Sequence, residues 1–137
     1  MDRTEVRTNV FKILFQLEAR PLEDSEEVMD LYCEQNGITK SRDVRQIKER
    51  VSGILPHLEE IDAQIEKYSN GWKKNRLGKA ELAILRLAVY EILWDEKVPS
   101  AVAANEAVNL CKNYAQEKAP TFVNGILAKV IETKEQQ

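Results

Sequence analysis

The sequence from Glu81 to Trp94, ELAILRLAVYEILW, determines how the rest of this chain folds. Nearly every position in it is apolar, and only Arg86 and Glu91 interrupt the apolar run that follows its first residue. A helix that is apolar on all sides is a buried helix, whereas a membrane-crossing helix needs about 20 apolar residues. The stretch therefore predicts the central helix of a soluble bundle. Gly78 marks its start, and Lys97-Val98-Pro99 marks its end.

The composition is typical of an ordinary soluble helical protein. The 137 residues are 43% hydrophobic and 31% charged, and five glycines and four prolines supply few of the turns that an all-β chain needs. This length predicts one domain whose core needs neither disulfides nor metals as staples. The net charge of −3 provides no global basic field, so a nucleic-acid site has to be a local patch.

The sequence contains no motif for catalysis, metal binding or cofactor binding. A glycine-rich phosphate loop, a nucleophile paired with a base, and zinc or calcium ligand spacings are all missing. Cys33 and Cys111 lie far apart without a Cys-x-x-Cys spacing, which favours two reduced and buried thiols. The N-terminal segment has no apolar run long enough for a secretory signal. We therefore expect a cytoplasmic binding protein that is not an enzyme, uses no cofactor and holds no metal.

The first helical segment, from about Thr4 to Glu18, carries two lines of residues. One is an apolar stripe with the spacing of a single helical face, which we expect to face the core: Val6, Val10, Ile13, Leu14 and Leu17. The other runs along a neighbouring face in steps of four and drifts by about 40° per step. It places cations and aromatic rings together: Arg3, Arg7, Phe11 and Phe15.

Three breaks interrupt the helical pattern further along the chain. Asn36-Gly37 ends a second helix that opens near Asp24 or Ser25. Pro56 falls inside a long pattern that starts near Ser41, and it predicts a kink or two abutting helices. Ser69-Asn70-Gly71 is the clearest break, and it predicts the boundary between an N-terminal half, about residues 1–69, and a C-terminal half, about residues 70–137.

A basic cluster beside an aromatic residue follows the third break and has two interpretations. It either holds phosphates or forms a solvated loop whose tryptophan packs into the core, and the second is favoured because charge runs usually face water. The cluster consists of Trp72, Lys73, Lys74, Arg76 and Lys79.

The last helix is predicted to start at Pro120, since proline favours the first turn of a helix. It contains Asn124-Gly125 in its interior, where the glycine costs about 1 kcal/mol relative to alanine. We therefore expect either close packing or the approach of a ligand to compensate at this position.

Four segments of the chain resemble the NusB family of bacterial transcription antitermination factors. They are ELAILRLAVYEIL at residues 81–93, Val98-Pro99, NEAV at residues 105–108 and FVNGIL at residues 122–127, and their order and spacing are similar to the family pattern. The resemblance is specific from Trp72 to Ile131 and weaker before it. It implies an all-α fold, a helical bundle of about seven helices in two packed subdomains.

The resemblance also implies a function without catalytic residues. NusB proteins bind the single-stranded boxA element of nascent ribosomal RNA leader transcripts together with NusE, a ribosomal protein. The pair helps the RNA polymerase antitermination complex to read through terminators.

The residues expected to bind RNA follow from the same resemblance. Arg3 and Arg7 match the arginine-rich start of the family and are expected to hold phosphates, with Lys12 and Lys118 as further cations. Phe15 matches an aromatic position, and bases of single-stranded RNA stack on such rings for about 1–3 kcal/mol each.

Four further positions are carried over from the final and central helices, and Asn105 is considered with them. Phe122 is the matching aromatic residue of the last helix, and Asn124, like Asn105, either bonds base edges or is structural. Glu81 and Arg86 match positions on the side where NusE docks. A polar residue in an apolar helix is, however, also typical of a buried pair or a cap.

Two other readings remain open. The chain is also compatible with a helical protein–protein adaptor whose basic residues are merely solvated. It further resembles the NusB-like accessory domain of some RNA methyltransferases, although it lacks any glycine-rich cofactor-binding region. A monomer and a homodimer fit the amphipathic helices equally well.

Overall fold

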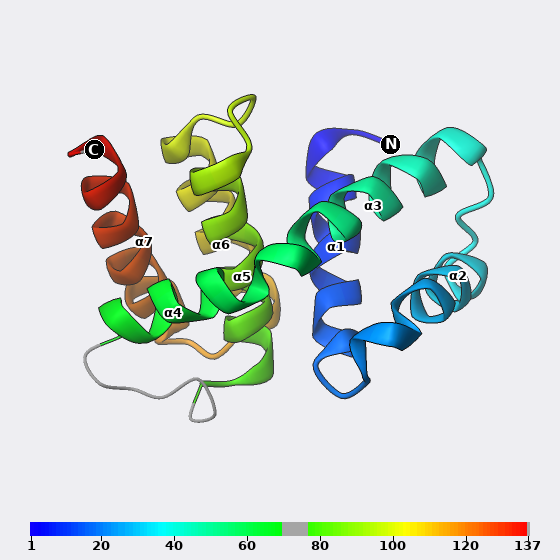
Figure 1. Ribbon diagram of the computed structural model, residues 1–137, viewed down its shortest axis with the longest axis horizontal. Helices are drawn as coiled ribbons and strands as arrows, with labels where there is room; N and C mark the ends of the chain where they lie inside the picture. Colours follow the sequence, from blue (N-terminus) through cyan, green and yellow to red (C-terminus); the bar gives the residue numbers. More distant parts are fainter. Residues whose placement is uncertain (70–76, 137) are drawn as a thin grey trace. The chain divides into compact units, whose positions relative to one another are not determined.

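The computed structural model describes residues 1–69 and 77–136, and these ranges contain helices and no strand (Figure 1). The described α-helices are α1 (Arg3–Leu17), α2 (Ser25–Gln35), α3 (Ser41–Ile54), α4 (Leu58–Tyr68), α5 (Lys79–Trp94), α6 (Ser100–Tyr114) and α7 (Ala119–Glu135). Two short 3-10 helices accompany them, η1 (Leu22–Asp24) and η2 (Leu55–His57). The all-α fold expected from the sequence is confirmed. Several predicted features lie outside the described residues: Asn70, Gly71, Trp72, Lys73, Lys74 and Arg76.

The chain divides into two compact units, Met1–Pro56 and His57–Gln137. This division lies earlier than the boundary expected near residues 69 and 70. The physical reason is the position of α4, which packs against α5 and α7 of the second unit. A local break in the sequence at Ser69-Asn70-Gly71 does not reveal that packing.

The two breaks predicted within the first unit and at its end are confirmed. Gly37 has a φ of 66°, in the left-handed region that glycine adopts without strain, and the chain leaves α2 there. At Pro56, η2 separates α3 from α4, so the long helical pattern forms two abutting helices.

In the first unit, α1 packs against both α2 and α3. Its apolar stripe is buried as expected: Val6, Val10, Ile13, Leu14 and Leu17. The Asp2 side chain accepts the backbone N–H of Glu5 at 2.8 Å and caps the start of α1. Lys48 of α3 pairs with Glu26 at 2.8 Å and with Asp30, both on α2, and so links these helices.

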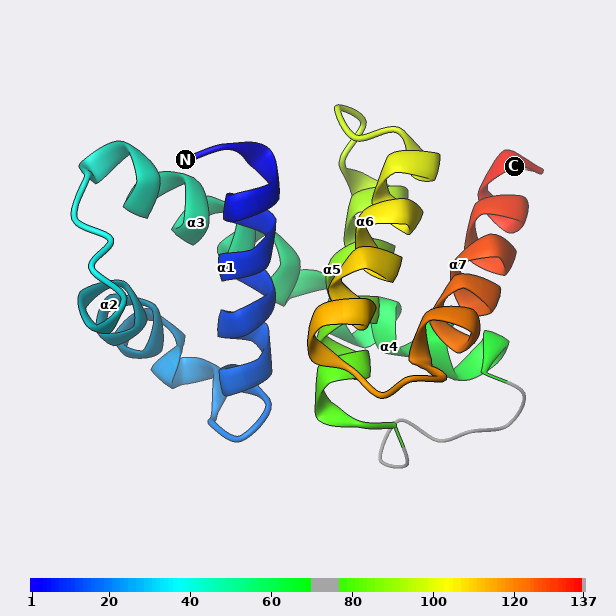
Figure 2. The same cartoon turned by 180° about the vertical axis from the view of Figure 1, so that it is seen from behind.

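In the second unit, α5 is the central helix, in contact with α4, α6 and α7. Figure 2 shows α5, α6 and α7 side by side, with α4 crossing them. Residues Leu82–Val89 and Ile92 of α5 are buried, as the apolar run of this segment predicts. The Tyr68 hydroxyl lies 2.6 Å from Thr133 Oγ1 and connects α4 to α7.

None of the helices in the described ranges is both long enough and apolar enough to cross a membrane.

Candidate functional site

The line of cations and rings on α1 is not a continuous surface. Arg7 and Phe11 in its middle are 5% and 3% exposed, whereas Arg3 and Phe15 at its ends are exposed, Phe15 by 42%. Each step of four residues turns the line by about 40°, so it crosses the buried face of α1 instead of following the surface. Arg7 therefore presents little surface to a phosphate. Its phosphate contact stays a prediction, and its burial argues against a direct one.

Lys12 and Phe15 form the accessible part of the predicted site in the first unit. Lys12 is half-buried, and it lies three residues before Phe15, which is the spacing of side-chain neighbours on a helix. The exposed ring leaves area on which a base can stack, and the neighbouring ammonium group can pair with a phosphate. Arg3 adds an exposed cation in the first turn of α1.

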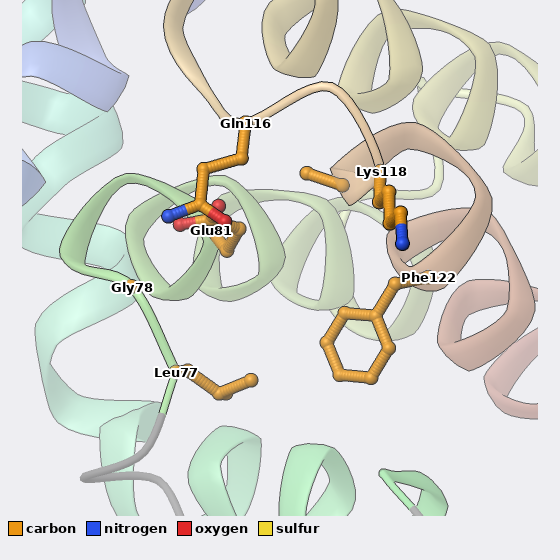
Figure 3. Close-up of a pocket in the computed structure, with 7 residues that line it drawn as sticks. Leu77, Gly78, Glu81, Gln116, Lys118 and Phe122 are labelled. Carbon is orange, nitrogen blue, oxygen red and sulfur yellow. The ribbon is translucent and has the colours of Figure 1, made fainter.

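A pocket in the second unit brings three of the predicted residues together (Figure 3). Its volume is about 300 Å³, and it is lined by Leu77, Gly78, Glu81, Gln116, Lys118, Ala119 and Phe122. These residues come from the start of α5, the connection between α6 and α7, and the first turns of α7. The Phe122 ring and the Leu77 side chain point into the pocket, and Lys118 lies above the ring in the view of Figure 3. Glu81, Lys118 and Phe122 thus meet although they are far apart in sequence.

Glu81 forms the polar wall of this pocket and is only 8% exposed. It lies in the first turn of α5, where the helix dipole favours an acidic side chain. Its carboxylate folds back over Gly78 so closely that a Cβ at Gly78 would lie 2.1 Å from Glu81 Oε2. Burial, and secondly the charge of Glu81, raise the pKa of the Cys111 thiol to about 11. Glu81 therefore packs over the start of α5, which is a structural role. Its role in docking a partner stays a prediction.

Arg86 does not share the pocket with Glu81. The two residues are five positions apart on α5, which turns their side chains about 140° from each other. The Arg86 guanidinium bonds both carboxylate oxygens of Asp62 on α4, each at 2.9 Å, and Arg86 is 7% exposed. This buried pair fastens α4 to α5. Its geometry argues for a structural role, and direct partner contact by Arg86 stays a prediction.

Asn124 lies in a different groove from Phe122, because side chains two positions apart on a helix point in directions about 200° apart around its axis. This groove runs between α6 and α7, has a volume of about 610 Å³, and holds Asn105 as well as Asn124. Both amides are exposed. The two asparagines that the sequence analysis considered together therefore do lie together, away from the Phe122 ring.

A third hollow lies on the other side of Phe122, and the sequence did not predict it. It lies between α4 and α7, has a volume of about 390 Å³, and is lined by Lys67, Tyr68, Thr121, Phe122, Gly125, Ile126 and Lys129. Lys67 and Lys129 come from two helices that are distant in sequence, so no local pattern predicts their proximity. The one signal in the sequence was the glycine in the interior of the last helix.

Within residues 1–69 and 77–136, no three histidine, cysteine, aspartate or glutamate side chains are grouped as a metal site requires. Both cysteines are buried free thiols, and burial raises the pKa of Cys33. Within these ranges the protein is all-helical, and rings and cations such as Phe122, Lys118 and Lys129 lie beside its pockets.

The chain belongs to the NusB family, whose model matches residues 4–132. It is 43% identical over 129 residues to the transcription antitermination protein NusB of Agathobacter rectalis, an alignment that covers 94% of this chain and 98% of that protein. The resemblance seen in the sequence is thereby confirmed.

Solved structures of the same family agree with this assignment. A structure of NusB from T. maritima has a TM-score of 0.86 and 33% identity, and the match covers 96% of this chain and 92% of that one. A structure of the antitermination factors NusB and NusE in complex with double-stranded RNA matches with a TM-score of 0.84 and 31% identity, covering 96% of each chain.

Proposed function

We propose that this chain is a transcription antitermination factor that binds boxA RNA together with the ribosomal protein NusE. It acts by binding alone, in the cytoplasm, as a component of an RNA polymerase antitermination complex. The observation that carries the proposal is the pocket in which Lys118 and Phe122 meet at the side of Glu81. Membership of the NusB family, and the likeness to a structure that contains NusB, NusE and RNA, support it.

The pocket combines the two kinds of group that recognise single-stranded RNA. The half-buried Phe122 ring has a face for an unstacked base, and the exposed Lys118 ammonium group supplies charge for the adjoining phosphate. The apolar side chain of Leu77 excludes water from the same space. A base stacked on Phe122 contributes about 1–3 kcal/mol.

The exposed residues of α1 supply further contacts in the proposal. Lys12 and Arg3 hold phosphates, and Phe15 stacks a base. Asn124, with Asn105 beside it, offers amide groups for base edges. NusE docks on the side of the pocket that Glu81 lines.

Fluorescence anisotropy tests the proposal. A labelled boxA RNA and a scrambled RNA of equal length are each titrated with the full chain, alone and with NusE, and a double-stranded version of the same sequence is measured in parallel. We expect a preference for boxA that grows when NusE is added. A chain that binds NusE but treats all the RNAs alike would be a protein–protein adaptor, and the proposal would be wrong.

The role of the pocket is tested by Phe122→Ala. We expect boxA RNA to bind about 5- to 150-fold more weakly, which corresponds to the loss of one stacked base. Leu31→Ala is the matched control, because Leu31 is an apolar side chain of α2 that is 46% exposed and lies outside the proposed site. Unchanged affinity in Phe122→Ala, with folding verified by circular dichroism, would remove the stacking role.

A further inference from the structure

Within residues 1–69 and 77–136, the fold gives no packing reason for a glycine at position 125. It lies in the interior of α7, where glycine lowers helix stability relative to alanine, and its φ is not in the left-handed region. Apart from its chain neighbours and the adjoining backbone of α7, a Cβ built at Gly125 would meet no heavy atom of the described residues within 4 Å. The described residues therefore supply no close packing at Gly125, and the open space in front of it leaves room for a ligand to approach.

The space in front of Gly125 is the groove between α4 and α7, with Phe122 at its edge. Phe122 also lines the pocket of Lys118, so its ring separates two adjacent hollows. A strand whose base stacks on Phe122 would thus place a neighbouring nucleotide in the groove. Because glycine has no side chain, the nucleotide can approach the helix backbone more closely at Gly125 than it could at any other residue type.

Two lysines give the groove a positive charge. Lys67 reaches it from α4, with its ammonium group 5.2 Å from the centre of the Tyr68 ring, and Lys129 reaches it from α7. Lys129 Nζ lies 3.8 Å from Glu132 Oε2 on the same helix. Both side chains of that pair are more than half exposed, and such pairs contribute little, so Lys129 can exchange Glu132 for a phosphate.

We propose that this groove is a second RNA subsite, which takes the nucleotide adjoining the one stacked on Phe122. Its ribose and base lie against Gly125, and its phosphate is held between Lys67 and Lys129. The subsite rests on the RNA binding proposed above, and it extends the RNA path from the α6–α7 connection onto the α4–α7 face.

Gly125→Ala tests the subsite, because its two expected effects have opposite signs. The added methyl group should raise the melting temperature of the full chain, since alanine is the better helix former and the position is open. The same methyl group should weaken binding of the labelled boxA RNA at least about fivefold, the lower end of what one stacked base contributes. A variant that is more stable and yet binds RNA less well cannot be explained by damage to the fold.

Lys67→Ala and Lys129→Ala test the phosphate contact separately. Because both lysines hold the same phosphate, the double variant Lys67→Ala/Lys129→Ala should make the slope of log K against log salt concentration shallower by about 0.7, the value for one phosphate contact on a single strand, and each single variant should change it by less. Lys97→Ala is the matched control, because Lys97 is an exposed lysine of the turn between α5 and α6, outside the groove. It should leave the slope unchanged.

The outcomes separate this subsite from the function on which it rests. If the wild-type chain binds boxA RNA, and Gly125→Ala, Lys67→Ala and Lys129→Ala all bind it equally well, the subsite is wrong and the proposed function stands. If the wild-type chain binds no RNA, with or without NusE, both are wrong. Loss of affinity in Gly125→Ala together with a lowered melting temperature would also overturn the subsite, because Gly125 would then be structural.

Discussion

Arg86 illustrates how a charged residue that resembles a family position can make a structural contact. Its guanidinium bonds Asp62 with two parallel hydrogen bonds, and the side chains of the pair are 9% and 13% exposed. Removing one partner of such a pair leaves the other charge uncompensated in a poorly solvated site. The pair therefore has to be tested for stability before any effect of Arg86 on NusE binding is interpreted.

We predict that Arg86→Met lowers the free energy of unfolding by about 3 kcal/mol, because Asp62 is left without its bidentate partner. Urea denaturation followed by circular dichroism measures this loss. The double variant Asp62→Leu/Arg86→Met should recover part of it, since neither charge of the pair then remains. A single variant as stable as the wild-type chain would show that the pair contributes nothing to the attachment of α4 to α5.

At the scale of the helices, periodicity predicted what the core contains. The stripe of α1 and the apolar run of α5 are buried as expected, because each is repeated over several turns of one helix and depends on no distant residue. The line from Arg3 to Phe15 was less predictable. Residues spaced by four lie on nearly one face of a helix over two turns. Over three turns the line of residues rotates across the buried side of α1, so Arg7 and Phe11 are buried.

Features made by two helices could not be predicted from the sequence. The contact of Arg86 with Asp62 joins residues 24 positions apart. Lys67 and Lys129 line the same groove although they belong to two separate helices. The division of the chain at Pro56 likewise depends on what α4 packs against. The pocket of Glu81, Lys118 and Phe122 was reached through the family resemblance, which supplied residues that periodicity alone does not bring together.

The N-terminal cap of α1 is a prediction at the same scale. The Asp2 side chain accepts the Glu5 backbone N–H at 2.8 Å, so Asp2→Ala should lower the free energy of unfolding by about 1 kcal/mol. Asp2→Asn is the matched control, because asparagine caps a helix about as well as aspartate. Urea titrations of the three chains measure both effects. An equal loss in both variants would assign the effect to the charge of Asp2 and not to its cap.

For the whole molecule, the net charge of −3 determines how RNA binding should respond to salt. A chain without a broad basic field gains little from long-range attraction, so its electrostatic affinity comes from individual contacts between cations and phosphates. With about four such contacts, the slope of log K against log salt concentration should be near −3 for a single strand. The slope thus counts the phosphate contacts, which a single affinity at one salt concentration cannot separate from uncharged contacts.

Two neighbouring residues of one pocket should therefore give different signatures in the same titrations. Lys118→Ala removes a phosphate contact, so the slope should become shallower by about 0.7, for boxA and scrambled RNA alike. Phe122→Ala removes a stacked base, so affinity should fall at every salt concentration while the slope stays the same. Titrations of labelled RNA at four or more salt concentrations measure both slopes. If both variants changed the slope equally, or neither lowered affinity, the pocket would not be the place where this chain holds a base and its phosphate side by side.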